Sequence, residues 1–169
     1  EISECLVGSE MCIRDRIATA RLSGMMLDYP KLLDKGIGGL RSDLQEKLKE
    51  QPDNNFYKAG IQCLDIFVDC ASHLQQDARD QMASADEKRQ KELERICQAL
   101  ENIKEKKPGT FHEAMQLFWL FALLAGVINY GRLDDYLGPY LVADLESGRL
   151  TDEEAYRYIP VSYTHLRAH

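Results

Sequence analysis

The sequence lacks the features that identify a membrane protein or a nucleic-acid-binding protein. It contains no apolar run of about twenty residues and no signal peptide, so nothing in it predicts a membrane span or export. Its 21 Lys and Arg residues are outnumbered by 28 Asp and Glu residues, which gives a formal net charge of −7. Nucleic acids and anionic membranes require clustered basic residues, whereas these charges are dispersed. We therefore expect neither nucleic acid nor membrane as a partner.

Cysteine is sparse, and the five cysteines show no C-x-x-C spacing. Cys63, Cys70 and Cys97 have apolar neighbours and no adjacent Lys, Arg or His that would lower a thiol pKa, apart from Arg95 near Cys97. We therefore predict that they pack in the core and are not reactive. An odd number of unpatterned cysteines is typical of reduced thiols in a cytoplasmic protein. No Ser, Cys or Lys has the setting of a nucleophile, and we assign no catalytic residue to this chain.

The two ends of the chain differ from its middle. One permitted codon choice for Pro160–His169, read as its reverse complement, encodes the residues of Val7–Arg16. Evolved protein segments have no reason to be complementary in this way, and the nucleotides resemble a sequencing-library adaptor. We therefore interpret 1–16 and 160–169 as mostly adaptor-derived and exclude them from the fold. A zinc or redox pair at Cys5 and Cys12 is the alternative that we set aside.

The segment 17–159 has helical patterning throughout, which predicts a mainly α fold. The expected helices cover residues 28–50, 54–82, 84–106, 110–128 and 132–146, and a further helix begins at residue 151. Capping boxes mark three of the starts, at Ser84, Thr110 and Thr151. A bend is expected at the glycines of 36–39, which do not match a phosphate-binding loop because no strand precedes them.

The most informative segment is the uninterrupted apolar run Leu117–Ile128. It is too short to span a bilayer and too apolar for one face of a surface helix. Such a helix must be covered nearly all round, and the amphipathic helices beside it offer little cover. We therefore expect the chain to be an internal piece of a larger protein.

Two polar groups suggest chemistry. Asp65, Asp69, His73 and Asp77 follow one another at i, i+4 spacing, which could bind a divalent metal or relay protons. A solvated acidic helix edge explains the same pattern, and we predict no metal site. His112, beside Glu113 at a helix start, is interpreted as a surface or interface residue.

Several segments together resemble the large domain of glycyl radical enzymes, the pyruvate formate-lyase-like family. They are Leu27–Leu33, Lys35–Ile37, Thr110–Phe118, Tyr130–Tyr136 and Asp144–Ala155. The resemblance implies that the parent is a ten-stranded α/β barrel surrounded by helices, inside which a cysteine thiyl radical attacks the substrate. It also implies a glycyl radical that a partner activating enzyme installs with S-adenosylmethionine and an iron–sulfur cluster, and a homodimeric parent.

Both radical-carrying residues of the family lie downstream of this segment, so the resemblance implies a fragment that is inactive alone and binds no cofactor itself. Glycerol-dehydratase-like members carry a Gly-His-Ser-type stretch where this chain has Ala125, Gly126 and Val127, and a further His is missing near Ser23–Met25. These departures argue against a polyol substrate. We take Gly126, Val127 and Asn129 as substrate-pocket candidates, and Arg132 and Asp134 as an ion pair that fixes the turn.

The expected function is therefore that of a piece of a radical lyase, dehydratase or decarboxylase acting on a small organic substrate. The alternative from another class is a non-catalytic helical bundle that serves as an interaction or metal-binding module. A reading frame that continues into a cysteine loop and a glycine loop would distinguish the first from the second.

Overall fold

The computed structural model describes residues 26–127, 129–156 and 158. Within them the chain forms five named helices and no strand, which confirms the predicted mainly α class. The helices are α2 (Tyr29–Glu50), α3 (Asn55–Met82), α4 (Glu87–Ile103), α5 (Phe111–Ala125) and α6 (Leu133–Glu146). The segments 1–16 and 160–169, interpreted as adaptor-derived, lie outside the described residues, as does Ser23–Met25.

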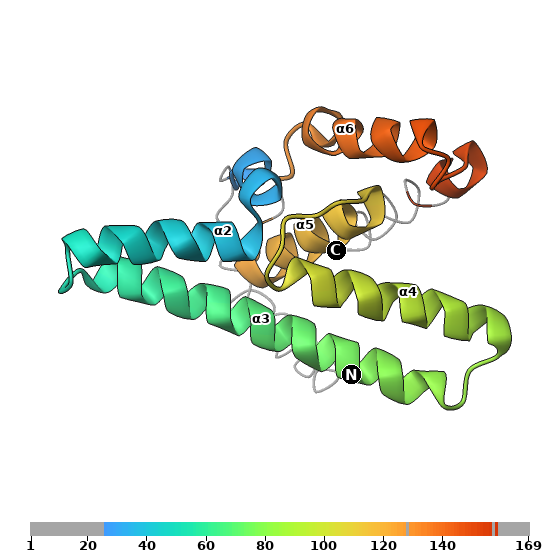
Figure 1. The fold of residues 1–169 in the computed structure, drawn as a ribbon, viewed down its shortest axis with the longest axis horizontal. Coiled ribbons are helices and arrows are strands. Elements are labelled where there is room, and N and C mark those ends of the chain that lie inside the picture. The colour runs from blue at the N-terminus through green and yellow to red at the C-terminus, as the bar shows by residue number, and fades with distance from the viewer. Residues whose placement is uncertain (1–25, 128, 157, 159–169) are drawn as a thin grey trace, which may run out of the picture.

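The helices α2, α3 and α4 are successive antiparallel neighbours, and α5 lies between α4 and α6 (Figure 1). Because α5 contacts all four other named helices, it forms the centre of the described structure. Among the described residues, no helix is both long enough and apolar enough to cross a membrane.

Side-chain caps define most helix starts, as the sequence predicts. Asp28, Asn54 and Thr110 each accept a hydrogen bond from a backbone N–H in the first turn of the helix that follows. The capping box at Thr151 is reciprocal, because its hydroxyl accepts from the Glu154 N–H while the Glu154 carboxylate accepts from the Thr151 N–H.

The predicted capping box at Ser84 is wrong. The carboxylate of Asp86 caps α4 and accepts from the Arg89 N–H at 2.8 Å, while the Ser84 hydroxyl donates back to the carbonyl of Gln81. The positive end of the helix dipole stabilises a carboxylate at this position more than a neutral hydroxyl. Asp86 therefore caps the helix in place of Ser84.

The predicted bend of α2 lies at Gly36, whose φ of 66° is left-handed. Its cause is a close approach of two backbones. A Cβ on Gly36 would lie 2.7 Å from the backbone nitrogen of Lys107, and a Cβ on Gly38 would overlap the carbonyl oxygen of Glu105. The glycines therefore allow α2 to pack directly on the segment that links α4 to α5.

The main core surrounds α5. Leu117 and Phe118 are at most 1% exposed, and burying each large side chain contributes roughly 1.5–3 kcal/mol. The other fully buried large side chains come from α2 and α4, namely Tyr29, Leu33, Ile37, Leu100 and Ile103. On the other side of this core, the Tyr140 hydroxyl in α6 donates to the carbonyl of Leu33 in α2 at 3.1 Å.

The inward face of α3 does not follow the apolar residues alone. Ile66 is 58% exposed, and Leu74 is also exposed. Gln75 is buried in place of Leu74, and its amide donates to the Cys97 carbonyl at 2.9 Å. Because this hydrogen bond crosses from α3 to α4, a polar residue satisfies an inward position that apolar periodicity cannot identify.

Candidate functional site

The turn that follows α5 holds the predicted pocket residues. Gly126 ends the helix in a left-handed conformation, with φ 64°. Its N–H donates to the Leu123 carbonyl, and the Val127 N–H donates to the Ala122 carbonyl, which is the Schellman pattern. The helix therefore ends at Ala125 and not at residue 128. The predicted range was too long because it followed the apolar run, which continues past the glycine that stops the helix.

The three pocket candidates have different surroundings within this turn. Gly126 is the helix stop, and Val127 is only 4% exposed. Asn129 is exposed, and its side-chain oxygen accepts a hydrogen bond from the Gly131 N–H at 3.2 Å. The backbone of Asn129 also forms an isolated parallel bridge with Met26. Of the three, Asn129 is the one whose side chain reaches solvent.

Four aromatic rings pack together beside this turn. Tyr29 at the start of α2 stacks on Tyr136 with ring centroids 5.2 Å apart and meets the edge of Phe118 at 4.9 Å. Tyr130 packs against Phe118 at 5.5 Å. The Tyr136 hydroxyl donates to the carbonyl of Tyr130 at 2.7 Å, whereas the buried Tyr29 hydroxyl has no hydrogen-bond partner among the described residues.

Burial controls the ionisation of these tyrosines. It raises the pKa of Tyr29 to about 12, with a smaller contribution from Tyr130. Burial likewise raises the pKa of Tyr136 and of Tyr130 above the usual range. All three hydroxyls are therefore protonated at neutral pH, which makes them hydrogen-bond donors and not bases.

Arg132 and Asp134 form the predicted pair at the start of α6. The guanidinium donates to the carboxylate at 2.7 Å, and both side chains are largely exposed. The hydrogen bond from Arg132 lowers the pKa of Asp134, and the same bond raises the pKa of Arg132. Solvent screens an exposed pair of this kind, so the pair contributes little to the stability of the fold. Its role in fixing the turn stays a prediction.

A buried carboxylate from α6, which the sequence analysis did not identify as important, lies at the opposite end of α5. Asp144, 4% exposed, lies near the end of α6. One of its oxygens accepts from the Phe111 N–H at 2.8 Å, and the other accepts from the Arg149 guanidinium at 2.8 and 2.7 Å. Asp144 therefore supplies α5 with a cap from a distant part of the chain.

The Glu113 carboxylate adds a second connection at this end. It accepts from the Gly109 N–H at 2.7 Å and, through its other oxygen, from the Asn102 amide at 2.7 Å. One half of the predicted capping box is confirmed, because the Thr110 hydroxyl accepts from the Glu113 N–H. The other half is wrong, because the Glu113 carboxylate accepts from the N–H of Gly109 and not from that of Thr110. This arrangement joins the start of α5 to the end of α4.

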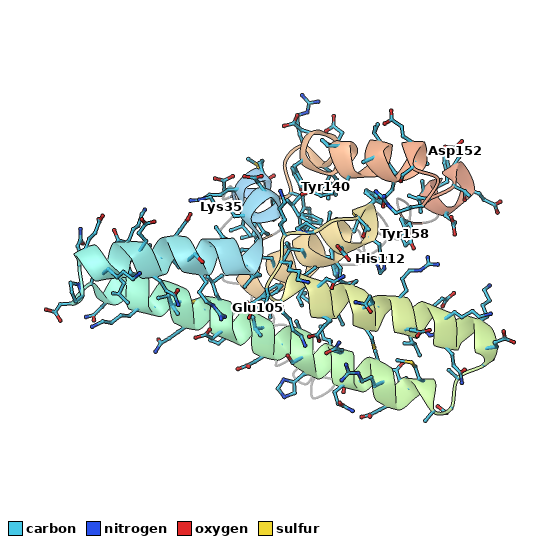
Figure 2. The ribbon with its side chains drawn as sticks, in the orientation of Figure 1. Lys35, Glu105, His112, Tyr140, Asp152 and Tyr158 are labelled. Atoms are coloured by element: carbon cyan, nitrogen blue, oxygen red, sulfur yellow. The ribbon has the colours of Figure 1, made fainter. Side chains whose placement is uncertain are left out.

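His112 is half-buried, and its ring lies 5.7 Å from that of Tyr158 (Figure 2). The guanidinium of Arg95 donates to the Tyr158 hydroxyl at 3.2 Å. Burial lowers the pKa of His112, Arg95 lowers it further, and Glu113 opposes the shift. His112 is therefore an interface residue between α5 and the segment that follows α6.

The acidic edge of α3 does not assemble a metal site in the part of the chain that is described. Asp65 pairs with Arg41 of α2 at 2.7 Å, and the His73 ring donates to the Asp69 carbonyl at 2.8 Å. No group of three or more His, Cys, Asp or Glu side chains among the described residues could hold a metal ion.

The described cysteines show no reactive arrangement. The Cys97 thiol is buried and donates to the Gln75 carbonyl at 3.6 Å. Cys63 is exposed and Cys70 is half-buried, both on α3. The described thiols are free and not joined by a disulfide.

Comparison with known proteins decides the family. A model described as pyruvate formate lyase-like matches residues 5–169. The chain belongs to this family. The motif-bearing segments Thr110–Phe118 and Asp144–Ala155 meet at the start of α5, through the hydrogen bond between Phe111 and Asp144.

Individual members of the family are similar to this chain. The isethionate sulfite-lyase of Oleidesulfovibrio alaskensis is 30% identical over 146 residues, which cover 76% of this chain and 18% of that protein. The (2S)-3-sulfopropanediol dehydratase of Klebsiella oxytoca is 30% identical over 159 residues, 84% of this chain and 19% of that protein. The trans-4-hydroxy-L-proline dehydratase of Clostridioides difficile is 30% identical over 139 residues, 72% of this chain and 18% of that protein.

A solved structure has the same fold. The crystal structure of a glycyl radical enzyme from Archaeoglobus fulgidus matches 80% of this chain with a TM-score of 0.71 and 26% identity. The match covers 19% of that protein. The chain thus spans less than a fifth of the length of the relatives that it matches.

Proposed function

We propose that this chain is part of the catalytic subunit of a glycyl radical enzyme that acts on a small organic substrate as a lyase, dehydratase or decarboxylase. The observation that carries the proposal is the family match over residues 5–169, supported by the similar fold of a glycyl radical enzyme. The parent is a ten-stranded barrel, and the helices described here lie on its outside.

The chain alone is inactive in this proposal. The buried Cys97 thiol packs between α3 and α4, and Cys63 and Cys70 lie on α3. None of them fits the family's radical-carrying cysteine. The thiyl cysteine and the glycine that stores the radical belong to the rest of the parent polypeptide.

The proposed partner is an activating enzyme that installs the radical with S-adenosylmethionine and an iron–sulfur cluster. The parent is a homodimer in an anaerobic cytoplasm. We assign none of the residues described here to the radical chemistry. Their proposed role is to support the barrel from the outside.

The turn that holds Gly126, Val127 and Asn129 is proposed to border the substrate pocket. The exposed side chain of Asn129 supports this, because an amide also carries an NH2 group that can donate hydrogen bonds to a substrate. Its oxygen accepts from the Gly131 N–H, which fixes the orientation of the amide. In the full-length enzyme, Asn129→Ala is expected to raise KM several-fold with little change in kcat. An unchanged KM would remove Asn129 from the pocket.

The decisive experiment begins with the uninterrupted gene. We expect its reading frame to continue into a cysteine loop and a glycine loop. The encoded protein, incubated without oxygen with its activating enzyme and S-adenosylmethionine, is expected to show a glycyl radical by electron paramagnetic resonance. The 169-residue chain treated in the same way is expected to show none.

A stop codon soon after residue 159 would contradict the proposal and favour the helical bundle. A radical signal from the 169-residue chain would contradict the proposed inactivity while leaving the family assignment intact.

A further inference from the structure

The turn after α5 contains one peptide group that two side chains bind from opposite sides. The carbonyl of Tyr130 and the N–H of Gly131 belong to the same planar peptide unit. The Tyr136 hydroxyl donates to this carbonyl at 2.7 Å, and the Asn129 side-chain oxygen accepts from this N–H at 3.2 Å. The orientation of the Asn129 amide is therefore linked to Tyr136 through a single rigid group.

The two hydrogen bonds depend on each other. A donor at the carbonyl polarises the peptide group and makes its N–H a better donor, so each bond strengthens the other. A peptide plane also rotates as a unit, and a plane released by Tyr136 can turn its N–H away from Asn129. We therefore expect loss of the Tyr136 hydroxyl to weaken a hydrogen bond in which Tyr136 takes no direct part.

The core fixes the ring of Tyr136, which suits this residue to hold the peptide group. The side chain lies near the start of α6 and is buried. Its ring stacks on that of Tyr29 with centroids 5.2 Å apart and lies 5.7 Å from the ring of Phe118. Burial raises the pKa of the Tyr136 hydroxyl well above its usual range, so the hydroxyl keeps its proton and donates at neutral pH.

Asn129 is the exposed member of this arrangement. Because its side-chain oxygen accepts from Gly131, the NH2 group is the part of the amide that can donate to a bound molecule. An amide that is already fixed need not be ordered when a substrate binds, and this raises the affinity.

We infer that Tyr136 is a positioning residue for the substrate. Through the peptide group between Tyr130 and Gly131, it fixes the Asn129 amide so that the NH2 group donates to an acceptor oxygen of the substrate. This inference rests on the proposed function, in which Asn129 borders the substrate pocket.

Four variants of the full-length enzyme test the link. Tyr136→Phe removes the hydroxyl and keeps the ring. Tyr140→Phe is the matched control, because it removes another α6 hydroxyl that donates to a backbone carbonyl, in this case that of Leu33 in α2. Asn129→Asp keeps an acceptor oxygen for the Gly131 N–H but has no NH2 group, and Asn129→Ala removes both.

Hydrogen–deuterium exchange of the Gly131 amide, localised by fragmentation in the mass spectrometer and corrected for intrinsic rates, measures the hydrogen bond itself. We expect Tyr136→Phe and Asn129→Ala to speed this exchange at least about fivefold, and Tyr140→Phe and Asn129→Asp to leave it within about twofold of the wild type. Equal exchange in the wild type and Tyr136→Phe would overturn the inference. Equal acceleration in Tyr140→Phe would also overturn it, because it indicates a general loosening of α6.

Anaerobic steady-state kinetics, with isethionate and trans-4-hydroxy-L-proline as probe substrates, measure the role in binding. We expect Tyr136→Phe and both Asn129 variants to raise KM at least about threefold with little change in kcat, and Tyr140→Phe to change neither. The double variant Tyr136→Phe/Asn129→Ala is expected to match Asn129→Ala alone, because Tyr136 acts through the amide. An unchanged KM in Tyr136→Phe or Asn129→Asp, or additive increases in the double variant, would overturn the inference. If neither probe is turned over, the exchange comparison decides alone.

The radical signal separates this inference from the proposed function. An enzyme that carries the glycyl radical, but in which Tyr136→Phe changes neither KM nor the exchange of Gly131, overturns the positioning role alone. A gene without the cysteine and glycine loops overturns both. If Tyr136→Phe does not fold whereas Tyr140→Phe does, the hydroxyl serves the core and the inference is wrong.

Discussion

The carboxylate of Asp144 in α6 accepts a hydrogen bond from the backbone N–H of Phe111, the first residue of α5, at 2.8 Å. This contact links two of the segments that resemble the glycyl radical family. It also gives a structural role to Arg149, whose guanidinium holds the same carboxylate. A sequence motif of the family therefore has a structural role in this chain: it joins α5 to α6.

Asp144→Ala is expected to destabilise the start of α5 by about 2–3 kcal/mol, because it leaves the Phe111 N–H buried without a partner. Asp144→Asn keeps one acceptor and is expected to cost about 1 kcal/mol. Hydrogen exchange of the amides of 111–114 in the full-length enzyme gives the local free energy of opening. Equal exchange in the wild type and Asp144→Ala would show that the connection does not matter.

Tyr29→Phe is expected to be neutral or to stabilise the protein by up to about 1 kcal/mol, because it removes a buried hydroxyl that has no partner among the described residues. Tyr136→Phe is the matched control. Its hydroxyl donates to the Tyr130 carbonyl, so its loss is expected to cost about 1 kcal/mol. Thermal melting of both variants checks the difference. A larger loss for Tyr29→Phe would indicate a partner for that hydroxyl in the complete enzyme.

Gly38→Ala is expected to destabilise the protein by more than about 2 kcal/mol, since the added Cβ would overlap the carbonyl oxygen of Glu105. Gly109→Ala provides the control, because a Cβ there would lie 3.6 Å from the Glu113 carboxylate, which is an ordinary contact. We expect Gly109→Ala to change the stability by less than about 0.5 kcal/mol. Similar melting temperatures for the two variants would mean that α2 and the segment after α4 do not approach so closely.

The segment after α6 is expected to loosen in mild acid. Burial holds the pKa of His112 below the 6.5 of an exposed histidine, so the folded state binds its proton less readily than the unfolded state. The stability associated with neutral His112 is complete above pH 6.5. It is lost as the pH falls from 6.5 toward the lowered pKa of the folded state.

Hydrogen exchange of residues 152–156, corrected for the intrinsic effect of pH, measures this loss. His112→Gln is expected to remove the acid dependence, and His73→Gln, at an exposed position of α3, is the control that retains it. An unchanged acid dependence in His112→Gln would assign the effect to another group.

Local features of the fold could be predicted from the sequence because they depend on neighbouring residues. The caps at Asp28 and Thr110 and the bend at Gly36 follow from side-chain and backbone preferences over a few positions. The mainly α class was predicted from the helical periodicity of the sequence. The family was predicted from several short segments that occur in the family's order.

Features that depend on distant contacts could not be predicted. Asp144 caps a helix that begins 33 residues earlier in the sequence, and nothing near Asp144 indicates this partner. The bend at Gly36 was expected, but its reason, the approach of Glu105 and Lys107, depends on how α4 returns to α2. The placement of Gln75 is of the same kind, because its burial is compensated by Cys97 on another helix.

The hydrogen bond between Tyr140 and Leu33 has a consequence for biosynthesis. The two residues are 107 positions apart, so a ribosome adding about 5–20 residues per second completes Tyr140 roughly 5–20 seconds after Leu33. During this interval α2, α3 and α4 can form their hairpins, but the surface of α2 that later receives α6 is uncovered. This surface of α2 is therefore exposed on the nascent chain for several seconds or more, and we expect chaperones to bind there.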